Sequence, residues 1–184
     1  MKNLVIRSLP GVSPSPEHRH ESSVPSSFSV TLHTSPYGTL GAVNSALGCC
    51  YLGFHNNTDD AWAEFYQQYQ SKLEIKRDSS IPPCLPNYIN DPWHKPEHFV
   101  LIGTLFQLRV WYGLTQIPQH NEWSYSKLAQ HLGQPTSVRA IASAVARNPL
   151  AWCIPCHRVV PKSGGTGQYR WGANIKSELI SQQA

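Results

Sequence analysis

The chain has 184 residues and a formal net charge of +4, but residues 1–100 carry seven Lys or Arg and nine Asp or Glu, whereas residues 101–184 carry eight and two. A basic second half indicates a polyanionic partner, most simply nucleic acid, although a solvated basic face has the same signature. No apolar run approaches the ~20 residues that span a bilayer, and the apolar segment at the N-terminus is too short for a secretory signal, so we expect a soluble, cytoplasmic protein with no membrane partner.

Residues 8–27 are rich in Ser, Pro and His and have little hydrophobic periodicity, and we predict a flexible N-terminal extension over residues 1–27. Residues 28–97 are expected to form an N-terminal α/β subdomain and a linker. Three segments have strand-like patterns and are separated by turns rich in Gly, Asn and Pro: Ser29–Thr34, Thr39–Val43 and Cys50–Phe54. They predict an antiparallel meander.

A helix is predicted over Asp59–Lys76, and Thr58 or Asp59 can cap its N-terminus. Its apolar residues recur at helical spacing and should face the sheet; they are Trp62, Phe65, Tyr69 and Leu73. An aromatic stripe of this kind is typical of a core face rather than a ligand site.

Residues 78–97 are rich in Pro and Asp and predict the linker. His94 and His98 are four residues apart, which is the spacing of a helical metal pair, but Pro96 lies between them and disfavours a helix. We therefore predict no metal site.

Residues 98–184 are predicted to form a second domain. It should begin with a short strand over His98–Ile102, followed by a helix that Thr104 can cap and that Ile117-Pro118 ends. A last helix is predicted from Ala173 towards the C-terminus.

A helix-turn-helix is predicted in the middle of this domain. Ser124 can cap its first helix and Gly133 can end it, and the second helix should span Pro135–Arg147. The second helix is rich in alanine, and small side chains let a helix backbone come close to whatever it docks on. The same composition also suits a tightly packed internal helix.

The stretch Ile154–Val159 contains an adjacent Cys156 and His157. A thiol is a strong nucleophile only as thiolate, and a neighbouring imidazole can take its proton. Pro155 restricts the backbone, which predicts that Cys156 lies on a stiff turn rather than within a helix. The pair alone leaves an ordinary buried thiol as the alternative. The five cysteines are odd in number and irregularly spaced, which is typical of a reducing compartment rather than a disulfide framework.

In their order along the chain, the motifs of residues 101–184 resemble those of the O6-alkylguanine-DNA alkyltransferases, also called methylated-DNA–protein-cysteine methyltransferases. The matching motifs are Gly103-Thr104, Phe106-Gln107, Val110-Trp111, Ile117-Pro118, Ser124-Tyr125, Leu128-Ala129, Arg139-Ala140, Asn148-Pro149, Ile154-Pro155-Cys156-His157-Arg158-Val159, and Tyr169 with Gly172. Tyr169–Gly172 is most similar to the alkyltransferase module of the bacterial adaptive-response protein.

This resemblance implies an α+β fold. An N-terminal ribonuclease-H-like antiparallel sheet with a helix, to which Thr34–Phe54 is more weakly similar, would precede a C-terminal helical, winged-helix-like helix-turn-helix domain. The implied function is direct repair of double-stranded DNA containing O6-alkylguanine, by a monomer that needs no cofactor. The damaged nucleotide is flipped out of the stack, and its alkyl group, mainly methyl, passes to Cys156 in a single turnover.

The resemblance also implies roles for individual residues. His157 acts through a water as the base that generates the Cys156 thiolate. Arg139 fills the vacated place in the base stack, since a planar cation can stack on bases and hydrogen-bond. Tyr125 turns the phosphodiester of the extruded nucleotide, and Ser126 beside it binds DNA. The pocket for the base is expected to comprise Asn148, Val159, Tyr169, Arg170 and Trp171.

Three features depart from the family pattern. Gln183 stands where relatives have the Glu that orients His157, so a neutral amide replaces an anion and we expect slower, more pH-dependent transfer. Trp171 stands where many relatives have Gly, which predicts a narrower pocket that prefers methyl to benzyl-sized groups. The turn His120–Trp123 differs from the usual Gly-Glu pair and could change contacts with DNA.

Two alternative functions follow from these residues. A non-catalytic alkyltransferase-like protein that only binds damage would lack the acceptor thiol, so Cys156 disfavours it and Gln183 keeps it open. A helix-turn-helix regulator with an incidental Cys-His pair is the other.

Overall fold

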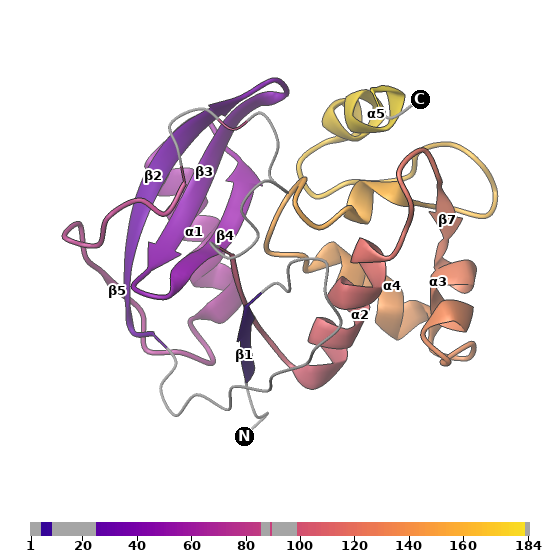
Figure 1. Ribbon diagram of the computed structural model, residues 1–184, viewed down its shortest axis with the longest axis horizontal. Coiled ribbons are helices and arrows are strands. Elements are labelled where there is room, and N and C mark those ends of the chain that lie inside the picture. The colour runs from indigo at the N-terminus through magenta and orange to yellow at the C-terminus, as the bar shows by residue number, and fades with distance from the viewer. Residues whose placement is uncertain (1–4, 9–24, 86–88, 90–98, 183–184) are drawn as a thin grey trace. The chain divides into compact units, whose positions relative to one another are not determined.

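The computed structural model describes residues 5–8, 25–85, 89 and 99–182. The chain divides into two compact units, Met1–Thr104 and Leu105–Ala184, which are described separately here (Figure 1). Strands dominate the first unit and helices the second, so the predicted α+β class is confirmed. No helix among the described residues is both long and apolar enough to cross a membrane.

The division between the units lies seven residues after the predicted boundary at residue 97. Strand β6 (Val100–Gly103) belongs to the first unit because it pairs antiparallel with β1 (Val5–Ser8). Strand β1 itself lies in the segment predicted as a flexible extension. Phe99 forms a further bridge with Cys49 and so ties the start of β6 to the main sheet.

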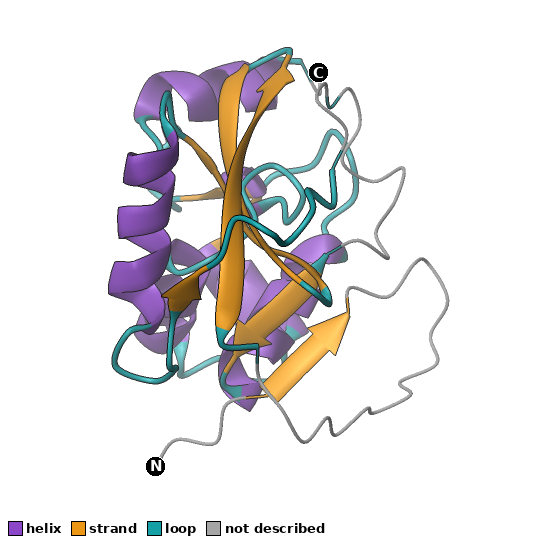
Figure 2. Ribbon diagram, turned by 90° about the vertical axis from the view of Figure 1, so that its left-hand side faces the viewer, coloured by secondary structure: helices purple, strands orange, loops and turns teal. Residues whose placement is uncertain are grey.

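The main sheet of the first unit has the strand order β4-β3-β2-β5. Strands β2 (Ser27–Ser35), β3 (Gly38–Ser45) and β4 (Gly48–Phe54) form the predicted antiparallel meander, and β5 (Lys76–Arg77) adds in parallel to β2. Each meander strand extends past its predicted bounds into the turn residues. Figure 1 shows α1 behind this sheet, and Figure 2 shows the helix-on-sheet layering from the side.

Helix α1 (Thr58–Tyr69) is capped by a residue that the sequence did not indicate. Asn57, rather than Thr58 or Asp59, has the extended backbone of an N-cap, and its Oδ1 accepts from the backbone N–H of Asp60 at 2.8 Å. The helix also ends well before the predicted Lys76. The Lys76 N–H instead donates to the Ser26 carbonyl at 2.7 Å, so strand pairing takes over there.

The core of the first unit joins the sheet to α1. Its buried residues include Phe28, Val43, Cys50, Tyr51, Phe65, Tyr69, Val100 and Ile102. The Phe28 and Phe65 rings lie 4.9 Å apart between centroids, and the Tyr69 hydroxyl donates to the Ile102 carbonyl at 3.0 Å. The predicted aromatic stripe therefore faces the sheet.

The second unit begins with α2 (Leu105–Thr115), followed by α3 (Tyr125–His131) and α4 (Val138–Ala146). As predicted, Ser124 caps α3: its hydroxyl accepts from the Lys127 N–H at 3.1 Å. Helix α4 begins three residues after the predicted Pro135 because Ser137 N–H closes a turn onto the Gln134 carbonyl. The indole of Trp111 in α2 donates to the Ala144 carbonyl of α4 at 2.9 Å and fixes these two helices together.

The rest of the second unit carries the Cys-His stretch. Strands β7 (Trp123–Ser124) and β8 (Val159–Val160) pair in parallel, a 3₁₀ turn η3 (Cys156–Arg158) directly precedes β8, and α5 (Ala173–Ser181) follows a loop. No three His, Cys, Asp or Glu side chains among the described residues gather into a metal site. The histidines His94 and His98 lie outside the described residues.

We expect Gly41→Ala to destabilise the first unit by about 1–3 kcal/mol, the usual cost of overpacking. Gly41 lies in β3 against α1, and a Cβ built on it would overlap the Cβ of Ala61. Urea unfolding measures the effect. The control is Gln67→Ala at an exposed position of α1; equal midpoints for the two variants would show that this approach is not tight.

Candidate active site

Cys156 lies on a tightly folded turn. The Pro155 backbone has φ −76° and ψ 56°, and the Cys156 N–H donates to the Ile154 carbonyl at 2.7 Å, so residues 154–156 form an inverse γ-turn. The single 3₁₀ turn η3 follows at once. The prediction that the thiol sits on a stiff turn is confirmed.

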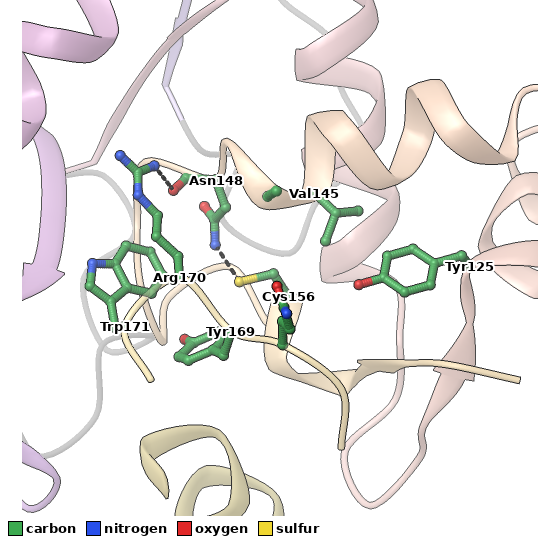
Figure 3. A pocket seen from close by; sticks show the side chains of 9 residues that line it. Tyr125, Val145, Asn148, Cys156, Tyr169, Arg170 and Trp171 are labelled. Carbon is green, nitrogen blue, oxygen red and sulfur yellow. Dashed lines mark hydrogen bonds between the residues drawn. The ribbon is translucent and has the colours of Figure 1, made fainter. Parts of the chain in front are cut away.

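The side chain of Asn148 holds this turn. It follows α4, is 1% exposed, and its Nδ2 lies 3.0 Å from the Ile154 carbonyl and 2.9 Å from the sulfur of Cys156. The same nitrogen donates to the Leu150 carbonyl at 3.1 Å, while Oδ1 accepts from the Leu150 N–H at 3.0 Å. One amide therefore ties the end of α4 to the turn and to the thiol (Figure 3).

A cavity of about 410 Å³ opens beside the thiol. Its lining residues are Tyr125, Val145, Ala146, Asn148, Cys156, Gln168, Tyr169, Arg170 and Trp171. Six of the predicted site residues thus come together here from α3, the end of α4, the η3 turn and the loop before α5. Figure 3 shows the Tyr125 hydroxyl pointing towards Cys156 from the side opposite Trp171.

The loop before α5 builds one wall of this cavity from three consecutive side chains. Tyr169 and Trp171 meet edge to face, with ring centroids 5.3 Å apart at an interplanar angle of 68°. The guanidinium carbon of Arg170 lies 5.5 Å from the Trp171 ring centroid, and its Nη1 donates to the Asn148 carbonyl at 3.3 Å. The wall is therefore anchored to the same residue that holds the thiol.

Opposing influences set the acidity of Cys156, which is only 6% exposed. Burial raises its pKa above that of a free thiol, whereas the Asn148 amide, the Tyr169 hydroxyl and the Lys176 charge lower it. Burial dominates, so the thiol is protonated at neutral pH. Burial and the nearby sulfur also raise the pKa of Tyr169 well above the ordinary value, so its hydroxyl stays protonated and can donate.

Lys176 is a buried cation that the predicted site did not include. It lies in α5, is 1% exposed, and donates from Nζ to the Val159 carbonyl at 2.8 Å. Burial lowers its pKa, and the charges of Cys156 and Glu122 raise it. The sequence signal was a single lysine among the apolar positions Ile175 and Leu179 of the last helix. The other cavity residues that were not predicted are Val145, Ala146 and Gln168, which adjoin predicted ones.

Several predicted site residues lie outside the cavity wall. His157 follows Cys156 in the η3 turn and is fully buried, and Val159 is the first residue of β8. Arg139 is exposed on α4, and Ser126 is half-buried on α3. Gln183 lies outside the described residues.

The chain is similar in sequence to a protein-family model and to several known proteins. Residues 105–184 match the family model described as "6-O-methylguanine DNA methyltransferase, DNA binding domain". The methylated-DNA–protein-cysteine methyltransferase of Methanosarcina acetivorans is 40% identical over 154 residues, which are 79% of this chain and 92% of that protein. The regulatory protein ada of Salmonella typhimurium is 49% identical over 82 residues, 45% of this chain, and the chain spans only 23% of that protein's length.

A solved structure has the same fold. The crystal structure of Mycobacterium tuberculosis OGT in complex with DNA superimposes with a TM-score of 0.55 at 24% sequence identity, and the match covers 85% of this chain and 92% of that one. The likeness therefore extends across both units of the chain, beyond the residues that the family model matches.

We expect Lys176→Met to raise the pKa of Cys156, because it removes a positive charge that favours the thiolate. Since the thiolate is the reactive form, carboxymethylation of Cys156 at neutral pH should slow severalfold and its pH midpoint should move upward. Site-resolved mass spectrometry measures the rate. Lys162→Met, at an exposed lysine of the neighbouring loop, should leave the midpoint unchanged; an unchanged midpoint for Lys176→Met contradicts the electrostatic role.

Proposed function

Because the chain belongs to the methylated-DNA–protein-cysteine methyltransferase family, we propose that it transfers an alkyl group from the O6 atom of guanine in DNA to its own Cys156. The observation that carries this proposal is the position of the Cys156 sulfur in the wall of a cavity of about 410 Å³. Aromatic and hydrogen-bonding side chains share that wall, which suits a flat, polar-edged base.

The protein would meet its substrate through α3 and α4, which we propose act as a winged-helix-like helix-turn-helix. The exposed face of α4 combines small residues, Ala140 and Ser143, with the cations Arg139 and Arg147. Small side chains allow close approach to a groove, and cations neutralise phosphates. The mycobacterial relative was crystallised in complex with DNA, which supports DNA as the partner. The first unit, with its β4-β3-β2-β5 sheet and α1, would be the family's ribonuclease-H-like part.

Base flipping follows from the buried position of the thiol. A stacked guanine cannot bring its O6 substituent to a sulfur that is 6% exposed, so the nucleotide must leave the helix at a cost of a few kcal/mol. Arg139 would fill the gap that it leaves, and Tyr125 with Ser126 would hold the turned phosphodiester. Tyr169, Arg170 and Trp171 would then enclose the base, with the Val159 main chain at its edge.

The chemical step needs a base because burial keeps the Cys156 thiol protonated. We assign that task to His157, acting through a water. The thiolate displaces guanine from the alkyl carbon: a sulfur–carbon bond forms, the carbon–O6 bond breaks, and guanine leaves with the electron pair and is protonated. Gln183 would orient His157 without the charge of a carboxylate. The thioether product is stable, so each molecule reacts once and needs no cofactor.

The proposed substrate is double-stranded DNA containing O6-alkylguanine, and the proposed actor is a cytoplasmic monomer. Incubation with an oligonucleotide that contains O6-methylguanine tests the activity. We expect a gain of one methyl on Cys156, no gain in Cys156→Ser, and an unchanged gain in Cys84→Ser, which alters a thiol of the first unit.

Other outcomes of this experiment identify the alternatives. Tight binding to the damaged oligonucleotide without any mass gain would indicate a protein that only binds damage. Equal binding to damaged and undamaged DNA, again without mass gain, would indicate a helix-turn-helix regulator.

We expect Trp171 to limit the size of the alkyl group, because its indole lines the cavity and is fixed between Tyr169 and Arg170. Trp171→Gly should accelerate reaction with free O6-benzylguanine by at least about tenfold, or ~1.4 kcal/mol in the barrier. Methyl transfer from O6-methylguanine in DNA is the internal control and should change far less. Rapid reaction of the unaltered protein with O6-benzylguanine would contradict a narrow pocket.

A further inference from the structure

A second cysteine lies three residues before the proposed acceptor, in the sequence Cys153-Ile154-Pro155-Cys156. Cys153 is 1% exposed, and neither Cys153 nor Cys156 takes part in a disulfide. The proposed alkyl transfer uses only Cys156 and gives Cys153 no role in the reaction. A pair of cysteines separated by two residues, with proline before the second, is a spacing at which thiols can exchange with a disulfide.

The backbone between the two cysteines is unusually compact. The Cys153 N–H donates to the Ala151 carbonyl at 2.6 Å around Trp152, whose φ is +64°, and this is a γ-turn of the rare, strained type. The inverse γ-turn at Pro155 follows immediately. Each cysteine thus closes a γ-turn with its backbone N–H, so two γ-turns lie within residues 151–156. Strain of this kind in a non-glycine residue is typical of functional segments.

The two sulfurs also act electrostatically on the same side chain, that of Tyr169. Negative charge on either Cys156 or Cys153 raises the pKa of the Tyr169 hydroxyl, so both thiols lie within electrostatic reach of the same group. Of the two cysteines, only Cys156 lines the cavity, and Cys153 is buried. A small oxidant that enters the cavity therefore meets Cys156 first.

We propose that Cys153 is a resolving thiol that converts oxidised Cys156 into a reversible Cys153–Cys156 disulfide. A hydroperoxide such as hydrogen peroxide supplies the oxidising equivalent. The Cys156 thiol first loses its proton, and the thiolate attacks one peroxide oxygen. The O–O bond breaks, Cys156 becomes a sulfenic acid, and the hydroxide that leaves takes up the thiol proton as water. The Cys153 sulfur then attacks the Cys156 sulfur, the S–OH bond breaks, and water leaves with the Cys153 proton.

The consequence for repair rests on the proposed function of Cys156 as acceptor, whereas the disulfide itself does not. A disulfide removes the nucleophile and so stops alkyl transfer, but two equivalents of a thiol reductant restore both thiols. Without Cys153, the sulfenic acid would advance to sulfinic acid, which thiols do not reduce. Cys153 thereby preserves an acceptor that can be used only once.

Peptide mapping of the full chain after treatment with hydrogen peroxide tests the proposal. We expect one intramolecular disulfide between Cys153 and Cys156, a mass loss of two hydrogens, and full return of both thiols with dithiothreitol. In Cys153→Ser and Cys153→Ala, Cys156 should instead be captured by dimedone as sulfenic acid and pass irreversibly to sulfinic acid. Cys84→Ser is the matched control at a thiol of the first unit and should form the disulfide as the unaltered protein does.

Irreversible oxidation of Cys156 in the unaltered protein without a Cys153–Cys156 disulfide would overturn the proposal, as would a disulfide that maps to another pair. Because the unaltered protein alone gives this result, a folding defect in the variants cannot hide it. Mapping of the disulfide does not depend on alkyl transfer. A protein that forms the disulfide but gains no methyl from O6-methylguanine therefore refutes the proposed function and leaves the resolving role of Cys153 intact.

Discussion

The amide of Asn148 is the contact on which the candidate active site depends. Its nitrogen meets two backbone carbonyls and the Cys156 sulfur, and its oxygen holds the Leu150 N–H. The backbone carbonyl of Asn148 accepts a hydrogen bond from Arg170 and so ties in the wall formed by residues 169–171. A buried amide with every group occupied is expensive to disturb, because each lost partner leaves a desolvated polar atom that costs about 1–3 kcal/mol. The Cys156 thiol, the turn that carries it and the cavity wall are thus all fixed through one residue, Asn148.

This arrangement fixes the position of the Cys156 thiol but does not by itself make the thiol reactive. Burial raises the pKa of Cys156, and the groups that lower it are a neutral amide, a neutral phenol and the charge of Lys176. A protonated thiol is a poor nucleophile, so under the proposed function deprotonation belongs to the moment when substrate and base are both in place. Lys176 reaches the site from α5 and is anchored on the Val159 carbonyl, so the last helix contributes charge even though Gln183 is neutral.

The sequence predicted the features that local chemistry controls. The Ser124 cap, the meander and the turn at Cys156 follow from side-chain hydrogen bonding, alternation and the proline restriction, and each appears in the structure. The misses depend on distant partners. Helix α1 stops at Tyr69 because Lys76 pairs with a strand almost fifty residues earlier, and Val5–Ser8 is ordered by β6 nearly a hundred residues later. Lys176 was missed for the same reason: only the packing of α5 brings it to the thiol.

Under the proposed function, Cys156 is a single-use acceptor, and this places an unusual demand on its surroundings. An enzyme that turns over must release its product, whereas a protein alkylated once can have a site that is rigid throughout. The strained γ-turn at Trp152 and the inverse γ-turn at Pro155 meet that demand, since they fix the thiol without any segment that needs to reopen. The same permanence makes accidental oxidation as final as repair, because a sulfinic acid cannot be recovered by thiols. The neighbouring thiol of Cys153 makes the two reactions differ. Alkylation of Cys156 remains irreversible, whereas oxidation ends in a disulfide that thiols can reduce back to the active cysteine.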